Sequence, residues 1–259
     1  MKALEDLKAH EARALEGLFF DLDDTFLDEG RLSEAAFSLL FSLQASGLRL
    51  IALTGRPASW AEQIARMWPV EAAIAENGAL SYKRVGAQVE RLDTLDPETR
   101  GLHRVRLEAL VALARAELSD LVPADDVDGR VSDYTFDIGE HEQAAEDTIR
   151  AAQALAQRAG ARTTRSSVHL HFTFDRSDKA TGALAYLRSS GLDPTSALRR
   201  FAFIGDSQND APAFAAFQTT CGVQNLRGHF SIPPRYITQQ KASAGFCAFG
   251  QRLIELRKP

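Results

Sequence analysis

Three short, mostly apolar runs that end abruptly in polar loops constrain the fold of this chain more than any other feature. They are residues 18–20, 48–53 and 201–204, and none shows clear alternation of apolar and polar residues. Such runs are typical of strands buried on both faces of a parallel sheet. Helix-period segments at residues 33–46 and 59–68 follow the first two runs. This alternation predicts an α/β fold with a doubly wound, Rossmann-like parallel sheet as its core.

The middle of the chain has a different pattern, in which the apolar residues of two segments alternate strictly. Alternation is typical of a sheet with one open face. We therefore expect an α+β insert over residues 83–175, within a core domain made of residues 1–82 and 176–259. Its elements are predicted as a hairpin at 79–92, a helix from Asp96-Pro97 to about Leu118, a strand at 131–138, a helix at 142–159 that stops at Gly160, and a strand at 168–174.

Composition excludes several classes of partner. The chain has 259 residues and a net charge of −5, which is a poor balance for neutralising nucleic-acid phosphates. No apolar run approaches the roughly 18 residues that a membrane span needs. Residues 1–16 are predicted as an amphipathic helix rather than a signal peptide, so we expect a cytoplasmic protein. Cys221 and Cys247 lack metal-ligand spacing and are interpreted as reduced thiols. Nothing in the sequence indicates the oligomeric state.

Carboxylates follow two of the predicted strands directly. Asp21 and Asp23 are two residues apart, so both side chains point into the crevice at the carboxyl ends of the strands. Their mutual repulsion requires a proton or a cation, and Mg²⁺ prefers such oxygen ligands. Asp206 and Asp210 follow the last strand and would complete the site. The alternatives are an Asp-rich turn after the first strand and a helix cap at Asp210.

Two further segments provide candidate phosphate ligands. Thr54-Gly55-Arg56 offers a hydroxyl and backbone N–H groups at the start of a helix, although an ordinary N-cap is the better interpretation of this tripeptide alone. Lys179 is placed to offset the negative charge of an aspartyl group and a phosphate. A solvent-facing lysine in a first helical turn is the common alternative.

In this order, the segments around Asp21, Thr54, Lys179 and Asp206 resemble the haloacid dehalogenase (HAD) superfamily of phosphohydrolases. The place of the insert resembles the type II (C2) cap arrangement, and residues 76–79 are similar to a segment common in those capped members. The similarity is greatest to subgroup IIB, which includes sugar-phosphate phosphatases.

The resemblance implies a role for each matching residue. Asp21 would be the nucleophile and a metal ligand, and Asp23 the general acid and base, with its backbone carbonyl on Mg²⁺. Asp206 would bind Mg²⁺ directly and Asp210 directly or through water. Thr54 and Lys179 would complete the catalytic set by holding the phosphoryl group. The implied substrate-binding residues are Thr54, Gly55, Arg56, Asn77, Lys179 and Asn209.

The activity implied is Mg²⁺-dependent hydrolysis of a small phosphorylated metabolite, a sugar phosphate by preference, through a phosphoaspartate on Asp21. Asp23 favours a phosphatase over a dehalogenase, because an alkoxide leaving group needs a proton. Two alternatives stay open, namely a phosphomutase of hexose phosphates and a non-catalytic binding module. The complete set of motif residues argues against the second.

Polar residues on the insert strands have two interpretations. They are His169, His171 and Thr173 on one strand, and Asp133, Thr135 and Asp137 on the other. A solvated outer face is favoured over contact with substrate. Solvent exposure is likewise expected for Arg162 and Arg165, and packing in the core or at its rim for Trp60 and Trp68.

Overall fold

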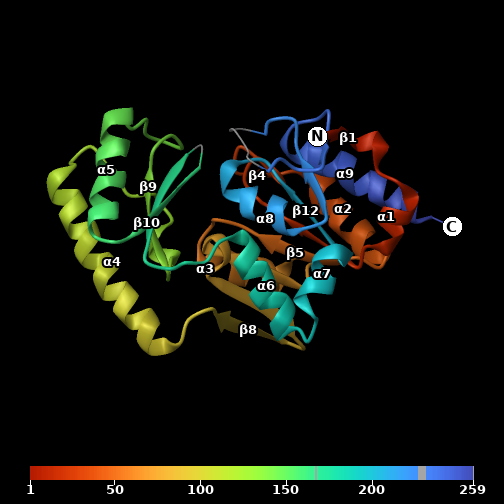
Figure 1. Cartoon of the computed structure of the whole chain (residues 1–259), viewed down its shortest axis with the longest axis horizontal. Helices are drawn as coiled ribbons and strands as arrows, with labels where there is room; N and C mark the ends of the chain where they lie inside the picture. Colours follow the sequence, from red (N-terminus) through yellow and green to blue (C-terminus); the bar gives the residue numbers. More distant parts are fainter. Residues whose placement is uncertain (167, 227–231, 259) are drawn as a thin grey trace.

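The computed structural model describes residues 1–166, 168–226 and 232–258. Within these ranges, nine strands form one main sheet (Figure 1). Each strand from β1 to β6 is parallel to its neighbours in this stretch of the sheet. The two remaining pairings, of β6 with β7 and of β7 with β8, are antiparallel. In spatial order the strands are β1 (Lys2–Ala3), β14 (Tyr236–Ile237), β13 (Thr219–Gly222), β12 (Phe201–Gly205), β2 (Gly17–Phe20), β5 (Arg49–Leu53), β6 (Ala72–Ala75), β7 (Leu80–Val85) and β8 (Gln88–Asp93).

Helices cover both faces of this sheet. Successive residues of a strand point to opposite faces, so neighbouring residues belong to different cores. Phe20 and Leu50 belong to a core shared with α1, α2, α3 and α9, whereas Phe19 and Ile51 belong to a core shared with α6, α7 and α8. The predicted doubly wound sheet is confirmed. The helices are α1 (Ala9–Ala14), α2 (Glu34–Ala45), α3 (Ala58–Met67), α6 (Lys179–Ser189), α7 (Pro194–Arg200), α8 (Ala211–Ala216) and α9 (Ala242–Arg257).

The hairpin β7–β8 belongs to the main sheet, in which β8 forms one edge. The boundary expected at residue 83 therefore falls inside this hairpin, and the chain leaves the sheet only after Asp93. A strand that pairs along its whole length extends the sheet it joins, which the hairpin pattern alone does not reveal. We call residues 94–175 the inserted unit.

The inserted unit contains an antiparallel three-stranded sheet with two helices packed on one side (Figure 1). Asp96 caps the first helix by accepting a hydrogen bond from the backbone N–H of Thr99 at 2.9 Å, as the Asp-Pro pair predicts. Gly160 ends the second helix with a φ of +75°, also as predicted. The elements are α4 (Pro97–Glu117), β9 (Asp133–Asp137), α5 (Glu146–Arg158), β10 (Arg162–Arg165) and β11 (His169–Thr173).

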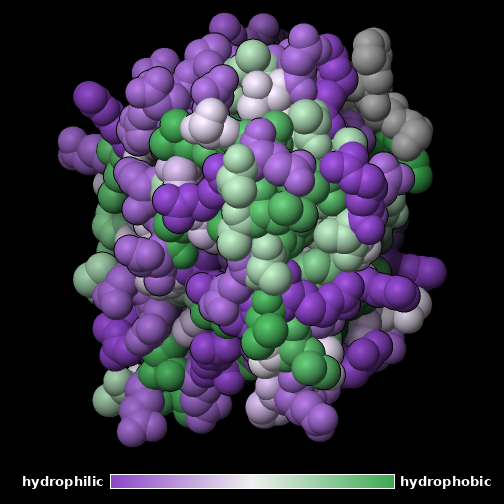
Figure 2. Space-filling model, turned by 90° about the vertical axis from the view of Figure 1, so that its left-hand side faces the viewer, coloured by the Kyte–Doolittle hydropathy of each residue, from purple (hydrophilic) through white to green (hydrophobic). Residues whose placement is uncertain are grey.

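One face of this small sheet is apolar and the other polar. Phe136, Leu170 and Phe172 pack against α4 and α5 in a separate core. On the outer side of the unit, shown in Figure 2, apolar side chains lie among polar ones, and α4 exposes Leu102 and Val105. The polar face of the sheet lies against the main sheet domain and is described below.

The N-terminal segment differs from the predicted helix over residues 1–16. Lys2 and Ala3 instead form the edge strand β1, which pairs with β14, and helix α1 covers only Ala9–Ala14. Leu4 and Leu7 are buried before this helix begins. Pairing with the open sheet edge supplies backbone partners that a local helix prediction does not consider. No helix within the described residues is long and apolar enough to cross a membrane.

Candidate active site

Carboxylates from the ends of two neighbouring strands meet at one point. Asp21 follows β2 and Asp206 follows β12, and each residue is only 4% exposed. Asp21, Asp206 and Asp210 each offer a carboxylate oxygen, and these atoms all lie within 4.8 Å of one another. The structure thus brings together three of the residues predicted as metal ligands.

The crowding of these carboxylates perturbs their titration. Burial raises the pKa of Asp21 to about 7, with Lys179 opposing the shift and Asp210 adding to it. Burial and the charges of Asp210 and Asp21 raise the pKa of Asp206 well above its ordinary value. A buried set of oxygen donors whose charges repel one another fits a hard divalent cation.

Lys179 lies in the middle of this cluster and is fully buried. Its Nζ is 2.7 Å from Oδ1 of Asp21 and donates to Oδ1 of Asp210 at 2.6 Å. Burial lowers the pKa of Lys179, but the two carboxylates outweigh it and hold the pKa above its ordinary value. The alternative of a solvent-facing lysine is therefore wrong. A lysine at the start of α6 reaches this point because Gly182 packs directly on Gly78, where a Cβ on Gly182 would lie 2.3 Å from the Gly78 Cα.

Asp210 uses both of its oxygens within the protein. Besides the bond from Lys179, its Oδ2 accepts hydrogen bonds from the backbone N–H groups of Asp206 and Ser207, both at 2.9 Å. Gly205 makes room for it, since a Cβ there would lie 2.5 Å from the Asp210 carboxyl carbon. Asp210 is therefore built to fix the Asp206 loop and Lys179 in place.

The candidate phosphate ligands gather beside this cluster. Thr54 is fully buried, and its hydroxyl oxygen accepts a hydrogen bond from the backbone N–H of Arg56 at 3.0 Å. Asn77 donates its backbone N–H to the Thr54 carbonyl at 2.9 Å. The Asn209 side chain donates to the side-chain oxygen of Asn77 at 3.3 Å. Residues from three separate segments thus form one polar group.

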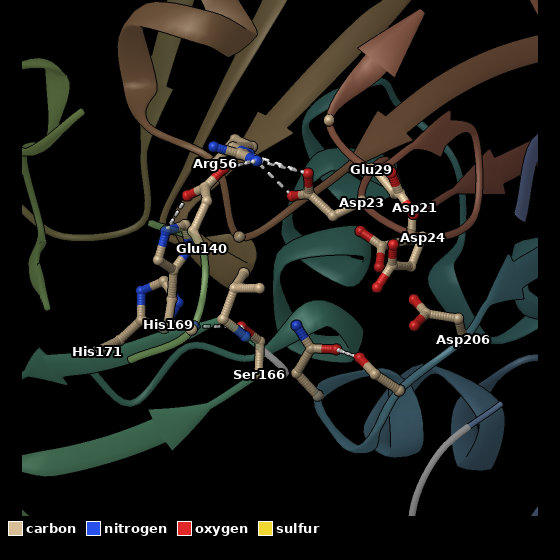
Figure 3. A pocket seen from close by; sticks show the side chains of 16 residues that line it. Asp21, Asp23, Asp24, Glu29, Arg56, Glu140, Ser166, His169, His171 and Asp206 are labelled. Atoms are coloured by element: carbon tan, nitrogen blue, oxygen red, sulfur yellow. Dashed lines mark hydrogen bonds and ion pairs between the residues drawn. The ribbon is translucent and has the colours of Figure 1, made fainter. Parts of the chain in front are cut away.

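Asp23 points away from the carboxylate cluster and toward Arg56, as Figure 3 shows. The Arg56 guanidinium donates to Asp23 and, at 3.2 Å, to Glu140 of the inserted unit. Arg56 also lies over the face of Trp60, with its guanidinium carbon 4.8 Å from the ring centre. The sequence motif placed Arg56 among the phosphate ligands, and the structure shows it bound to carboxylates on both sides.

Asp23, Arg56 and Glu140 line a cavity of about 430 Å³ between the main sheet domain and the inserted unit, to which Asp21, Asp206 and Asn209 also contribute. The polar face of the small sheet forms its far wall, so the expectation of a solvated outer face is wrong. His169 and His171 are each 4% exposed and line this cavity, whereas Asp133, Thr135 and Asp137 are buried beside them. Alternation along a strand identifies a polar face but not what covers it.

Glu76 joins the two parts of the molecule, which the sequence did not reveal. Its carboxylate accepts hydrogen bonds from the backbone N–H groups of Ala58 at 3.0 Å, Val131 at 2.9 Å and Ser132 at 2.6 Å. The Ser132 hydroxyl donates a further bond at 2.6 Å. Burial raises the pKa of Glu76, with Asp133 adding to the shift.

The remaining predictions concern surface and packing residues. Arg165 pairs with Glu146 at 2.8 Å and is absent from the cavity wall, which agrees with the surface interpretation. Trp68 packs against Phe26 with ring centres 5.3 Å apart, as predicted for the core or its rim. Cys221 and Cys247 are free thiols.

With this geometry established, the chain can be compared with known proteins. Residues 18–99 match the model of the haloacid dehalogenase-like hydrolases. This match agrees with the resemblance to the haloacid dehalogenase superfamily that the motifs indicate. The family is one of hydrolases, which agrees with the enzyme class that the motifs predict. No curated protein matches this chain.

Solved structures show the same fold as this chain. A Thermoplasma acidophilum protein superposes with a TM-score of 0.74 at 16% identity, covering 93% of this chain and 99% of the other. The sucrose-phosphatase of Synechocystis sp., solved with sucrose and phosphate, superposes with a TM-score of 0.65 at 16% identity, covering 92% of this chain and 98% of the other. A HAD subclass IIB sugar phosphatase superposes with a TM-score of 0.61 at 15% identity, covering 92% of this chain and 96% of the other. The superposition extends through the inserted unit.

Proposed function

We propose that this protein is a Mg²⁺-dependent phosphatase of small phosphorylated metabolites, with sugar phosphates as the preferred class. The observation that carries the proposal is the contact of Lys179 with Asp21, with Asp206 adjacent, at the ends of two neighbouring parallel strands. The sugar phosphatases among the structures with this fold support the substrate class.

In the first step we assign Asp21 as the nucleophile. Its carboxylate oxygen attacks the phosphorus atom, the bond from phosphorus to the ester oxygen breaks, and a phosphoaspartate forms on Asp21. Lys179 and the Thr54 hydroxyl hold the phosphoryl oxygens, and Gly55, Asn77 and Asn209 complete the polar surroundings. These donors stabilise the charge that develops on the phosphoryl group.

Asp23 is assigned as the general acid and then the general base. Its proton passes to the departing ester oxygen, so the product leaves as a neutral alcohol. Asp23 then accepts a proton from water, which attacks phosphorus and releases inorganic phosphate, and the Asp21 carboxylate is regenerated. Its side chain is one-third exposed at the cavity wall, where a leaving group can reach it.

The metal site is assigned to Asp21 and Asp206, with Asp210 holding the Asp206 loop. A bound Mg²⁺ neutralises phosphate charge and relieves the repulsion between the two carboxylates. Thr25 steadies Asp206 by donating its hydroxyl to Oδ1 at 3.1 Å. The side chain of Asp23 is committed to Arg56, so only its backbone carbonyl is assigned to the metal.

The inserted unit is assigned as the cap of this enzyme. It forms the far wall of the cavity, and Glu140 and the histidines of β11 are its contributions to the site. A cap of this kind excludes water from the phosphoaspartate until the leaving group departs, and it contacts the part of the substrate beyond the phosphate.

Asp21→Asn tests the proposal. We expect this variant to lose Mg²⁺-dependent phosphate release from p-nitrophenyl phosphate, while Asp120→Asn, on the exposed surface of the inserted unit, keeps it. Full activity of Asp21→Asn would refute the nucleophile assignment. Acid quenching during turnover should trap a labile phosphoryl group on the wild-type protein. Release of phosphate to water also separates a phosphatase from a phosphomutase.

A further inference from the structure

The wall of the cavity beyond the phosphoryl site is rich in carboxylates. Asp23, Glu29 and Glu140 line this part, and Asp24 lies beside them, as Figure 3 shows. The phosphate group itself is matched by Lys179 and the proposed cation. The charge of this outer part therefore acts on whatever the substrate carries besides its phosphate.

Arg56 is the one lysine or arginine among the described residues of the cavity wall, and it is already matched. Its guanidinium contacts Asp23 at 2.8 Å, Glu140 at 3.2 Å and Asp126 at 3.6 Å, and its side chain is only 6% exposed. Even while Asp23 carries the proton that it passes to the leaving group, Glu140 and Asp126 balance this guanidinium, so it has no net positive charge to offer to a second anionic group on the substrate.

Each of the two histidines in the cavity wall also contacts a carboxylate. His169 Nε2 lies 2.6 Å from Glu140 Oε2, and His171 Nδ1 lies 2.8 Å from Asp133 Oδ2. Burial lowers the pKa of His171, so its imidazole is neutral at ordinary pH. The contact with His169, reinforced by Arg56, lowers the pKa of Glu140 to about 2, so this carboxylate stays charged.

Glu29 adds a charge at the mouth of the cavity. It lies in the turn between β3 (Leu27–Asp28) and β4 (Arg31–Leu32), with a φ of +48°. The structure shows no ion pair or hydrogen bond of its exposed side chain within the described ranges. Glu29 and Glu140 thus approach the outer part of the cavity from opposite sides, one from the main sheet domain and one from the inserted unit.

Resting on the proposed function, we propose that this cavity selects phosphate monoesters whose remaining part carries no second anionic group, with Glu140 as the main determinant. Neutral polyols and amino sugars satisfy this condition, whereas phosphorylated sugar acids and bisphosphates do not. One additional like charge about 5 Å from Glu140 would lower kcat/KM by about 10- to 100-fold at the effective dielectric of a partly buried site.

Matched substrates test the selection directly. We would measure kcat/KM at saturating Mg²⁺ for glucose 6-phosphate against 6-phosphogluconate, and for fructose 6-phosphate against fructose 1,6-bisphosphate, with p-nitrophenyl phosphate as the reference. We expect the neutral member of each pair to be preferred by at least about tenfold. Equal values within both pairs would overturn the inference while leaving the phosphatase proposal intact. Absence of Mg²⁺-dependent hydrolysis of every substrate, including the reference, would overturn both.

Variants test the role of Glu140. Glu140→Gln keeps the shape of the side chain and removes one of the carboxylates that balance the Arg56 guanidinium. The preference for the neutral member of each substrate pair should therefore narrow by about tenfold, chiefly through KM for the anionic substrates. Glu29→Gln should narrow the preference for the neutral substrates less than Glu140→Gln does. Glu142→Gln removes the same charge from an exposed site in the same loop and should leave the preference unchanged. An unchanged preference in Glu140→Gln, with Glu29→Gln equally silent, would refute the charge argument.

Discussion

Arg56 holds Asp23 through a forked contact. Its Nε donates to both carboxylate oxygens of Asp23 at 3.0 and 2.9 Å, and its Nη2 donates to Oδ1 at 2.8 Å. The two residues follow the neighbouring strands β5 and β2, so the sheet itself sets their separation. A planar guanidinium in this position fixes the orientation of the carboxylate assigned as general acid.

Replacing Arg56 by Lys keeps the charge but removes the planar fork. We expect kcat to fall by about 10- to 100-fold for glucose 6-phosphate and by much less for p-nitrophenyl phosphate, because only the poor leaving group depends on a well-placed acid. Steady-state kinetics on both substrates measures this. Arg66→Lys, on the exposed side of α3, is the control. Equal losses on the two substrates would contradict the positioning role, and Asp23→Asn should show the same discrimination as Arg56→Lys.

Replacing Glu76 by Gln should destabilise the protein. The amide nitrogen would replace one of the two carboxylate oxygens. It would face the N–H groups of Ala58 and Val131 if it replaced Oε1, or those of Ser132 and Asp133 if it replaced Oε2, and either pair would lose its acceptor in a buried place. We expect a loss of about 2–3 kcal/mol in the free energy of unfolding, measured by urea denaturation. Glu62→Gln, at a partly exposed i,i+4 pair with Arg66 on α3, should change the free energy of unfolding by less than about 0.5 kcal/mol. A Glu76→Gln protein as stable as the wild type would show that this carboxylate does not hold the inserted unit.

The crowded carboxylates predict a pH dependence that Mg²⁺ removes. The pKa of Asp21 rises from 3.8 to about 7 on folding, so the folded protein binds this proton more tightly than the unfolded chain. The contribution of this proton to the free energy of unfolding is fully present below about pH 4 and is lost as the pH rises through 7. In the presence of a chelator, the melting temperature should therefore decrease as the pH is raised from 6 to 8, because Asp21 loses its proton over this range. Excess Mg²⁺ should restore the melting temperature.

Asp206→Asn isolates that effect. At pH 8 without metal, removing one carboxylate should stabilise the protein by about 1 kcal/mol, or roughly 2–4 °C in the melting temperature. The same variant should lose most of the stabilisation that Mg²⁺ gives to the wild type. Thermal unfolding in chelator and in Mg²⁺ provides both values. A variant that melts below the wild type in chelator yet responds fully to Mg²⁺ would argue against a shared cation.

Two glycines in helices should respond oppositely to alanine. A Cβ on Gly182 of α6 would lie 2.3 Å from the Gly78 backbone, so Gly182→Ala should displace α6, destabilise the fold by about 2 kcal/mol or more, and move Lys179 away from Asp21. A Cβ on Gly101 of α4 meets nothing within 4 Å, so Gly101→Ala should stabilise by about 0.5–1 kcal/mol. Denaturation of both variants, with activity measured alongside, checks the pair.

Local chemistry in the sequence determined much of this molecule. Apolar runs without alternation predicted β2, β5 and β12, and the carboxylates directly after β2 and β12 predicted that Asp21 and Asp206 lie together. Capping residues predicted the start of α4 and the end of α5. These predictions succeed because burial, strand ends and helix caps depend on residues that are neighbours in the chain.

Contacts between distant segments were decided only by the tertiary structure. Alternation marked His169 and His171 as one face of a strand, but only the docking of the inserted unit buries that face against the cavity. Arg56 was assigned to phosphate, yet its partners Asp23 and Glu140 lie 33 and 84 residues away in the chain. Long-range electrostatic pairing has no period or spacing in a single sequence, because it depends on which surfaces the fold brings together.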